Sequence, residues 1–120
     1  MKAAVTWIFS VLLALAFLGA GLAKLTAQPM MVGEFQTFGY PLWFMYVTGL
    51  IEIAGAIFVL APRFARIGAG LLVCVMIGAL ISHLSHGQAA MIGVPVILLL
   101  LALAVGTLRG WTGVRTAQPA

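Results

Sequence analysis

The chain has 120 residues, of which 64% are hydrophobic and 7% are charged, and its formal net charge is +4. Its mean hydropathy of +1.23 leaves too little polar surface to cover a water-soluble globule, so the composition excludes a soluble domain. The six cations are scattered singly or in one pair and form no basic patch, so we expect no nucleic-acid partner. The expected surroundings are a lipid bilayer.

Four apolar runs predict membrane-spanning helices, because about 20 apolar residues at about 1.5 Å each cross a hydrocarbon core of about 30 Å. The runs lack the polar alternation of barrel strands, which favours helices. We predict an all-α integral membrane four-helix bundle, with residues 1–120 as a single transmembrane domain. The predicted helices cover residues 5–25, 41–61, 66–83 and 89–108.

The first two predicted helices flank the longest connection. Residues 5–25 are interpreted as a membrane span, with a secretory signal cleaved near Gly21 and Ala23 as the less favoured alternative. The connection over residues 26–40 is too apolar for a freely solvated loop, so we expect it to lie on or dip into the membrane interface. The helix over residues 41–61 then opens at a proline, a tolerated starting residue.

The third predicted helix carries Gly70, Cys74, Gly78 and Ser82 at a spacing of four, which predicts a small-residue groove for another helix. Cys74 is the single cysteine, so dithiol chemistry within one chain is excluded. In the fourth predicted helix, Pro95 falls in an early turn, where we expect a slight kink.

The cations are unequal on the two sides of the predicted bundle. One side carries Lys2, Arg63, Arg66, Arg109 and Arg115, and the other carries Lys24 alone. The positive-inside rule therefore places the N and C termini on the cytoplasmic side of the membrane, which the chain crosses several times. The aromatic residues that fit the interfacial belts are Trp7 and Trp111 on the cytoplasmic side, and Tyr40, Trp43, Phe44 and Tyr46 on the other.

Glu52 is the acidic residue inside a predicted span, near the bilayer midplane. A carboxylate there costs at least about 2.5–3.5 kcal/mol, so it must be protonated, paired or turned inward. Helical spacing places it on one face with Thr48, Gly55 and Ala56. Glu52 is therefore the leading site candidate, with a purely structural hydrogen-bonding role as the alternative.

Lys24, at the end of the first predicted helix, is the second candidate for proton transfer or for polar contact with a ligand. A direct bridge from Lys24 to Glu52 is one alternative, but it must span a depth difference on the order of 10 Å, which makes Glu34 the easier partner. The alternative is a simple helix-end anchor.

His83 and His86, three residues apart, can turn both rings to one side of a helix end. They supply two metal ligands where a closed zinc site needs about four, so we expect no metal site. Surface proton exchange or helix capping suits them better.

Several segments resemble the DoxX family: GAGLAKL at residues 19–25, FGYP at 38–41, GLIEIAGAIFVL at 49–60, and the arginine-bearing turn at 63–70. The resemblance covers most of the chain. It implies a small four-helix protein of the bacterial inner membrane, in a family with members linked to quinone-dependent sulfur oxidation and to membrane oxidoreductase assemblies.

The resemblance and the site residues together suggest a redox-associated membrane component, linked to a quinone or a thiol. In this interpretation the cofactor is a quinone, held by Gly49, Glu52, Phe38, Tyr40 and His83. The isolated chain is then an accessory subunit of an oxidoreductase more readily than an enzyme, with a redox protein or a second copy as its partner. The alternatives are a proton-coupled transporter of small molecules and an assembly subunit of a membrane complex.

Overall fold

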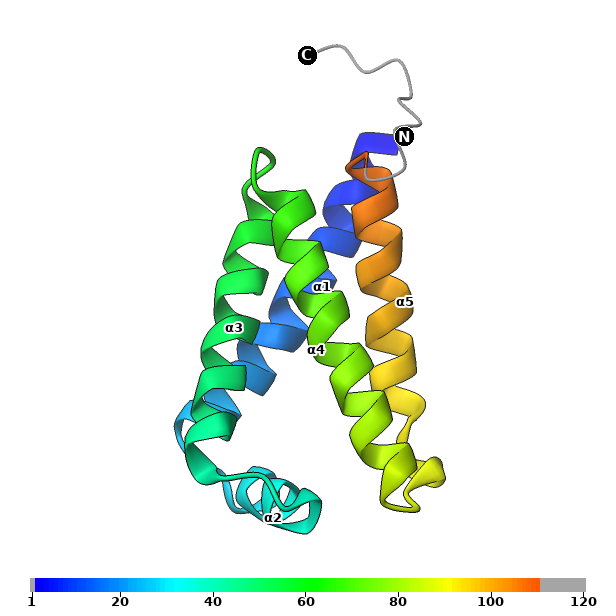
Figure 1. The fold of residues 1–120 in the computed structure, drawn as a ribbon. Coiled ribbons are helices and arrows are strands. Elements are labelled where there is room, and N and C mark those ends of the chain that lie inside the picture. Colours follow the sequence, from blue (N-terminus) through cyan, green and yellow to red (C-terminus); the bar gives the residue numbers. More distant parts are fainter. Residues whose placement is uncertain (1, 111–120) are drawn as a thin grey trace.

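The structure, a computed structural model, describes residues 2–110 and contains only helices and their connections over that range (Figure 1). The elements are α1 (Lys2–Leu25), α2 (Pro29–Phe38), α3 (Leu42–Leu60), α4 (Ala65–Ser85), a short 3₁₀-helix (Ala89–Met91) and α5 (Gly93–Leu108). The all-helical class is therefore confirmed. The predicted count of four is not, because these residues form five α-helices, and α2 lies in the segment expected to be a connection. Trp111 and Arg115, used in the topology argument, lie outside the described residues.

The four long helices surround one apolar core. α1 packs against α3 and α5, and α4 packs against the same two helices. Each helix contributes fully buried side chains, among them Phe17, Val59, Leu72 and Val105. The arrangement is a bundle in which each long helix contacts two others.

The outer faces of the bundle are apolar as well. Leu15, Ile81 and Ile97 are each 61–64% exposed. α1, α3 and α4 are long and apolar enough to cross a membrane, whereas α5 has 16 residues and a length of about 24 Å. Apolar surface on this scale requires cover by lipid, so the chain is a membrane protein.

Two glycine contacts bring helix backbones directly together. A Cβ on Gly21 of α1 would lie 2.8 Å from the carbonyl oxygen of Gly49 in α3, and a Cβ on Gly68 of α4 would lie 2.7 Å from that of Gly55 in α3. No side chain fits at these distances, so glycine at these positions permits the close crossings.

The predicted groove along Gly70, Cys74, Gly78 and Ser82 is not the packing surface of α4 against α3. Cys74 and Gly78 are exposed, and a Cβ on Gly78 would meet nothing within 4 Å. The contact goes through Gly68, which lies about 200° around the helix from Gly70. These small residues were expected to admit another helix, whereas within residues 2–110 Cys74, Gly78 and Ser82 line a cavity.

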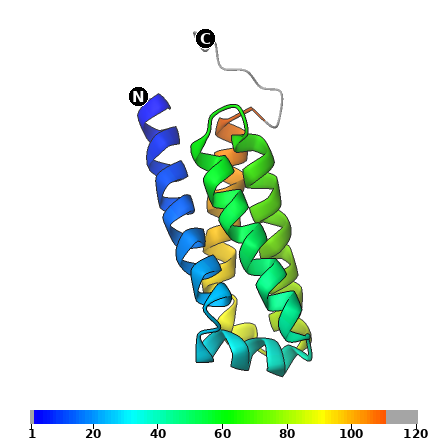
Figure 2. The ribbon, with the colours of Figure 1, turned by 90° about the vertical axis from the view of Figure 1, so that its left-hand side faces the viewer.

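The two ends of the bundle differ. The first and last described residues lie at one end, and α2 lies across the other (Figures 1 and 2). α2 begins at Pro29 and ends where Gly39 adopts a left-handed conformation with φ of 77°. There the backbone N–H groups of Gly39 and Tyr40 donate to the carbonyls of Gln36 and Phe35. This turn directs the chain from α2 into α3.

α5 begins later than the predicted helix over residues 89–108. Its first residue is Gly93, so Pro95 lies in the first turn. A proline there removes no intrahelical hydrogen bond, and the expected kink is not required.

Candidate functional site

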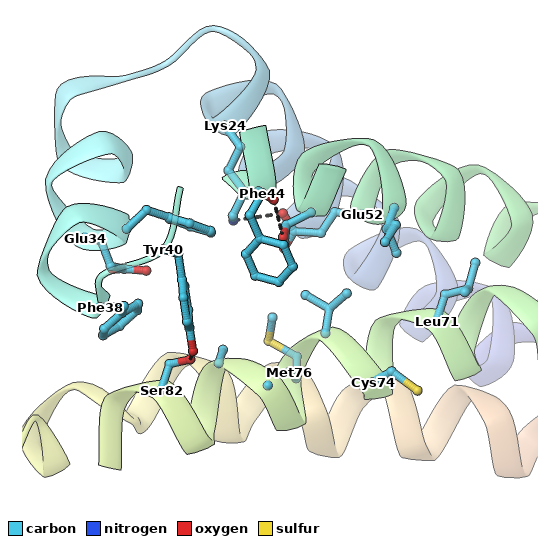
Figure 3. A pocket seen from close by; sticks show the side chains of 16 residues that line it. Lys24, Glu34, Phe38, Tyr40, Phe44, Glu52, Leu71, Cys74, Met76 and Ser82 are labelled. Atoms are coloured by element: carbon cyan, nitrogen blue, oxygen red, sulfur yellow. Dashed lines mark hydrogen bonds and ion pairs between the residues drawn. The ribbon is translucent and has the colours of Figure 1, made fainter. Parts of the chain in front are cut away.

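A cavity of about 340 Å³ lies between α2, α3 and α4 (Figure 3). α3 and α4 are in contact at Gly55 and Gly68 and diverge toward the end of the bundle that α2 covers (Figure 1). The cavity occupies the space between the diverging helices. Its walls are mostly apolar, and the ionisable residues that line it include Lys24, Glu34 and Glu52.

The deepest polar feature of the cavity is an ion pair between α1 and α3. Lys24 Nζ lies 2.8 Å from Glu52 Oε1, and the two side chains are only 10% and 1% exposed. Because the two charges are paired, neither is isolated in the apolar interior. The sequence favoured Glu34 as the partner of Lys24, and the structure shows that Glu52 is in ion-pair contact with it.

The ion pair depends on the glycine crossing. A Cβ on Gly49 would lie 2.9 Å from the Cβ of Lys24, so the lysine stem passes directly over this glycine. Glu52 is one turn further along α3, about 4.5 Å away along the axis, which a lysine side chain can span. The depth difference estimated from sequence was too large because α1 and α3 cross level with Gly49. Gly49, predicted to bind a cofactor, is not among the residues that line the cavity. Its lack of a side chain makes room for the stem of Lys24.

Glu52 Oε1 retains unused capacity to accept a hydrogen bond. The ammonium of Lys24, 2.8 Å away, occupies one of its lone pairs, and no further donor within residues 2–110 is bonded to it. A ligand or a water in the adjoining cavity could donate to the remaining lone pair.

Aromatic side chains form the wall of the cavity next to α2. Tyr40 packs edge-on against Phe35 and Phe44, with ring centroids 6.0 and 5.3 Å apart, and tilts against Phe38 at 5.7 Å. Its hydroxyl lies 2.6 Å from Ser82 Oγ of α4. This hydrogen bond joins the α2–α3 turn to α4 beside the cavity (Figure 3).

The α4 side of the cavity is formed by the small-residue face. Cys74, Gly78 and Ala79 line it, and Cys74 and Gly78 are also exposed on the outside of the bundle. The cavity therefore adjoins the lateral surface, which faces the lipid in a membrane. Cys74 is a free thiol at this position.

His83, predicted to bind a cofactor, does not line the cavity. Its Nδ1 lies 2.7 Å from Gln88 Oε1, and its ring packs edge-on against Phe38 at 5.1 Å. His86 contacts the same phenylalanine at 5.1 Å and donates from Nδ1 to the carbonyl of Ser82. Both rings contact Phe38, so they share one side of the helix end, as expected. Phe38 lines the cavity and the two histidines do not. No group of three or more metal-ligating side chains converges within residues 2–110.

The structure thus brings Lys24, Glu52, Phe38 and Tyr40 to one cavity, as expected of a single site, and leaves Gly49 and His83 outside it. Sequence reasoning missed Phe44 and Ser82. Phe44, Thr48 and Glu52 follow one another at a spacing of four, so the face of Glu52 could have been extended to Phe44 from the sequence. The pairing of Ser82 with Tyr40 spans 42 residues and has no local signal.

Comparison with known proteins agrees with this architecture. The model of the DoxX-like family matches residues 8–105, which include every α-helix of the described chain in whole or in part. The chain is 40% identical over 84 residues to the "Uncharacterized protein YdgD" of Bacillus subtilis (strain 168), a match that covers 67% of this chain and 74% of that protein. No solved structure gives a significant match. The family match, which extends over most of the length, shows that the chain belongs to the DoxX-like family.

Proposed function

We propose that this protein is a redox-associated membrane component that binds the headgroup of a quinone in the cavity between α2, α3 and α4. The observation that carries the proposal is the buried ion pair of Lys24 and Glu52 beside an aromatic cavity, because its carboxylate can accept a further hydrogen bond. A quinone headgroup matches both parts of this surface: its ring is apolar, its carbonyl oxygen can accept a hydrogen bond from Lys24, and the hydroxyl of its reduced quinol form can donate to Glu52.

The size and lining of the cavity fit such a group. A volume of about 340 Å³ is at the lower end of the range for small-molecule sites and accommodates a substituted ring. Phe38, Tyr40 and Phe44 provide aromatic faces and edges for stacking. The opening beside Cys74 and Gly78 provides a lateral path for an apolar tail into the lipid.

Lys24 and Glu52 supply the polar chemistry. The ammonium of Lys24 can donate to a carbonyl oxygen, and the carboxyl of Glu52 can give or take a proton at Oε1. The pair keeps the site neutral, so a proton can move without leaving a net charge in the apolar interior. A bound quinone would accept two electrons and two protons to become a quinol. The electrons must come from a partner protein or a substrate thiol, since the single cysteine cannot act as a dithiol.

The proposed setting is the bacterial inner membrane, with α1, α3, α4 and α5 all crossing it and both termini in the cytoplasm. α5 packs between α1 and α4 and is apolar, which supports a fourth crossing despite its length. α2 would then lie at the outer interface. Lys2 begins α1, Arg63 lies between α3 and α4, and Arg109 follows α5. These helix ends lie opposite α2 (Figure 1), which agrees with the positive-inside rule.

The test is equilibrium binding of decylubiquinone and dimethylnaphthoquinone to the purified protein in mild detergent, with mass spectrometry of co-purified small molecules. We expect Glu52→Gln and the double variant Lys24→Met/Glu52→Gln to weaken binding at least about tenfold, as expected for the loss of a charged hydrogen-bonding group. Glu34→Gln, which removes the other carboxylate that lines the cavity, is the matched control and should bind normally. Unchanged binding in both Glu52 variants would remove Glu52 from the site.

Transport of lipophilic cations in exchange for protons is the second candidate, because an interior carboxylate beside a lateral opening also suits it. The ion pair counts against it: an incoming cation must displace the ammonium of Lys24 from 2.8 Å. Proton-driven uptake of a lipophilic cation into vesicles containing the protein, abolished by Glu52→Gln, would favour transport over the redox proposal.

A further inference from the structure

A second cavity lies at the other end of the bundle, where α1 begins and α5 ends. Its volume is about 320 Å³, and it is lined by residues that include Lys2, Thr6, Trp7, Pro62 and Arg109. α2, whose residues line the first cavity, lies at the opposite end (Figure 1). The proposed quinone function makes no use of this second cavity.

Arg109 is held in this cavity by two contacts. Its Nη2 donates to Ser10 Oγ at 3.3 Å, and its guanidinium carbon lies 4.8 Å from the centroid of the Trp7 ring. Its Nε is buried and has no hydrogen-bond partner among the described residues. Burial lowers the pKa of Arg109 from its ordinary value, which shows that the cation is partly desolvated. A buried donor without a partner is costly, so the guanidinium has capacity left to bind an acceptor.

The chain offers no carboxylate side chain for this purpose. Its two acidic residues are Glu34 and Glu52, both of which line the first cavity, and Glu52 is already in contact with Lys24. The hydroxyl of Thr6 donates to the carbonyl of Lys2, and that of Ser10 donates to the carbonyl of Thr6. Lys2 and Arg109 therefore share this cavity, and the neighbouring hydroxyl groups of Thr6 and Ser10 donate their protons to backbone carbonyls.

We propose that the cavity formed by Lys2, Trp7 and Arg109 binds a phosphate group, presented by the head of an anionic phospholipid. Guanidinium N–H groups match phosphate oxygens in geometry, and the Lys2 ammonium adds a second charge. Basic pockets at the cytoplasmic ends of membrane helices are suited to lipid headgroups, and an indole beside the cation suits the interfacial depth. The competing explanation is that Lys2 and Arg109 only orient the chain in the membrane.

The experiment uses the full-length, delipidated protein in detergent. Native mass spectrometry measures retention of phosphatidylglycerol and of diacylglycerol with the same acyl chains, which lacks the phosphate. Phosphorus NMR measures binding of inorganic phosphate. The variants are Arg109→Gln, Lys2→Gln and, as control, Arg63→Gln. Arg63 lies in the α3–α4 turn at the same end, contacts Phe64 and does not line the cavity.

We expect phosphatidylglycerol to be retained in preference to diacylglycerol. Affinity should fall about tenfold in Arg109→Gln and about fivefold in Lys2→Gln, and stay unchanged in Arg63→Gln. The same variant pattern with inorganic phosphate but no retained lipid would assign the site to a soluble phosphate. Lys2→Gln disturbs no side-chain contact seen in the structure, so it decides the matter if Arg109→Gln does not fold.

Two results would overturn the proposal. One is an equal loss in Arg63→Gln, which would show a general effect of positive charge at this end. The other is the absence of any preference for phosphatidylglycerol together with no binding of inorganic phosphate.

Discussion

The ammonium of Lys24, near the end of α1, reaches across the backbone of α3 to lie 2.8 Å from the carboxylate of Glu52. Gly49 makes this possible, because a side chain there would collide with the lysine stem. The pair joins two helices and also forms the polar base of the cavity. One contact therefore links the packing of the bundle to its proposed chemistry.

The first prediction concerns the coupling within this pair. Lys24→Met and Glu52→Gln should each destabilise the protein by about 3–5 kcal/mol, because each strands a buried polar partner. The double variant should recover much of that loss, since it leaves no unpaired charge. Thermal unfolding in detergent, followed by tryptophan fluorescence, measures all three. Additive losses in the double variant would show that the two side chains do not interact.

The second prediction concerns the α1–α3 crossing. Gly21→Ala should cost about 1–3 kcal/mol, because its Cβ would lie 2.6 Å from Ile53 Cγ1 and 2.8 Å from the carbonyl oxygen of Gly49. Gly19→Ala is the matched control on the same helix, where a Cβ meets nothing within 4 Å. It should be neutral or slightly stabilising, since alanine favours helix. Equal unfolding temperatures for the two variants would contradict the close crossing.

The third prediction concerns the Tyr40–Ser82 hydrogen bond. Tyr40→Phe and Ser82→Ala each remove it, and each should cost about 1 kcal/mol. The double variant should cost little more than either single variant, because both remove the same bond. Tyr46→Phe, on a tyrosine that does not line the cavity, is the control. A double variant that loses the sum of the two effects would mean that the bond does not form in the membrane protein.

The fourth prediction concerns orientation in the membrane. The proposed topology has both termini in the cytoplasm, so a C-terminal fluorescent-protein fusion should fluoresce and a C-terminal alkaline phosphatase fusion should be inactive. Replacing Arg63 and Arg66 by Gln should weaken this preference. An active phosphatase fusion to the wild-type chain would reverse the proposed topology.

The sequence predicts the long helices well because each is a continuous apolar run bounded by Gly, Pro or charge. It does not predict α2 as a helix, since Pro29–Phe38 has only 10 residues and an isolated helix of that length is marginal; tertiary contacts with α1 and α3 support it. Glu52 is found from sequence because an acid inside a span is conspicuous. The Lys24 contact is missed because it depends on how far α1 and α3 slide past each other, which helix ends alone do not determine.

The small-residue face of α4 shows a related limit. Spacing alone indicates that Gly70, Cys74 and Gly78 share a face, and they do. It cannot say whether another helix or a cavity occupies that face. The outcome depends on Gly55 and Gly68, whose contact sets where α3 and α4 begin to diverge.

Protection of Cys74 tests the central claim most directly, because the single cysteine of the chain lines the proposed quinone cavity. The rate of alkylation by a lipophilic maleimide is measured with and without decylubiquinone, whose fully substituted ring resists addition of a thiol. We predict that the quinone slows labelling in the wild type and in Glu34→Gln, and that it has little effect in Lys24→Met/Glu52→Gln. A labelling rate that the quinone leaves unchanged in the wild type would contradict a quinone site between α3 and α4.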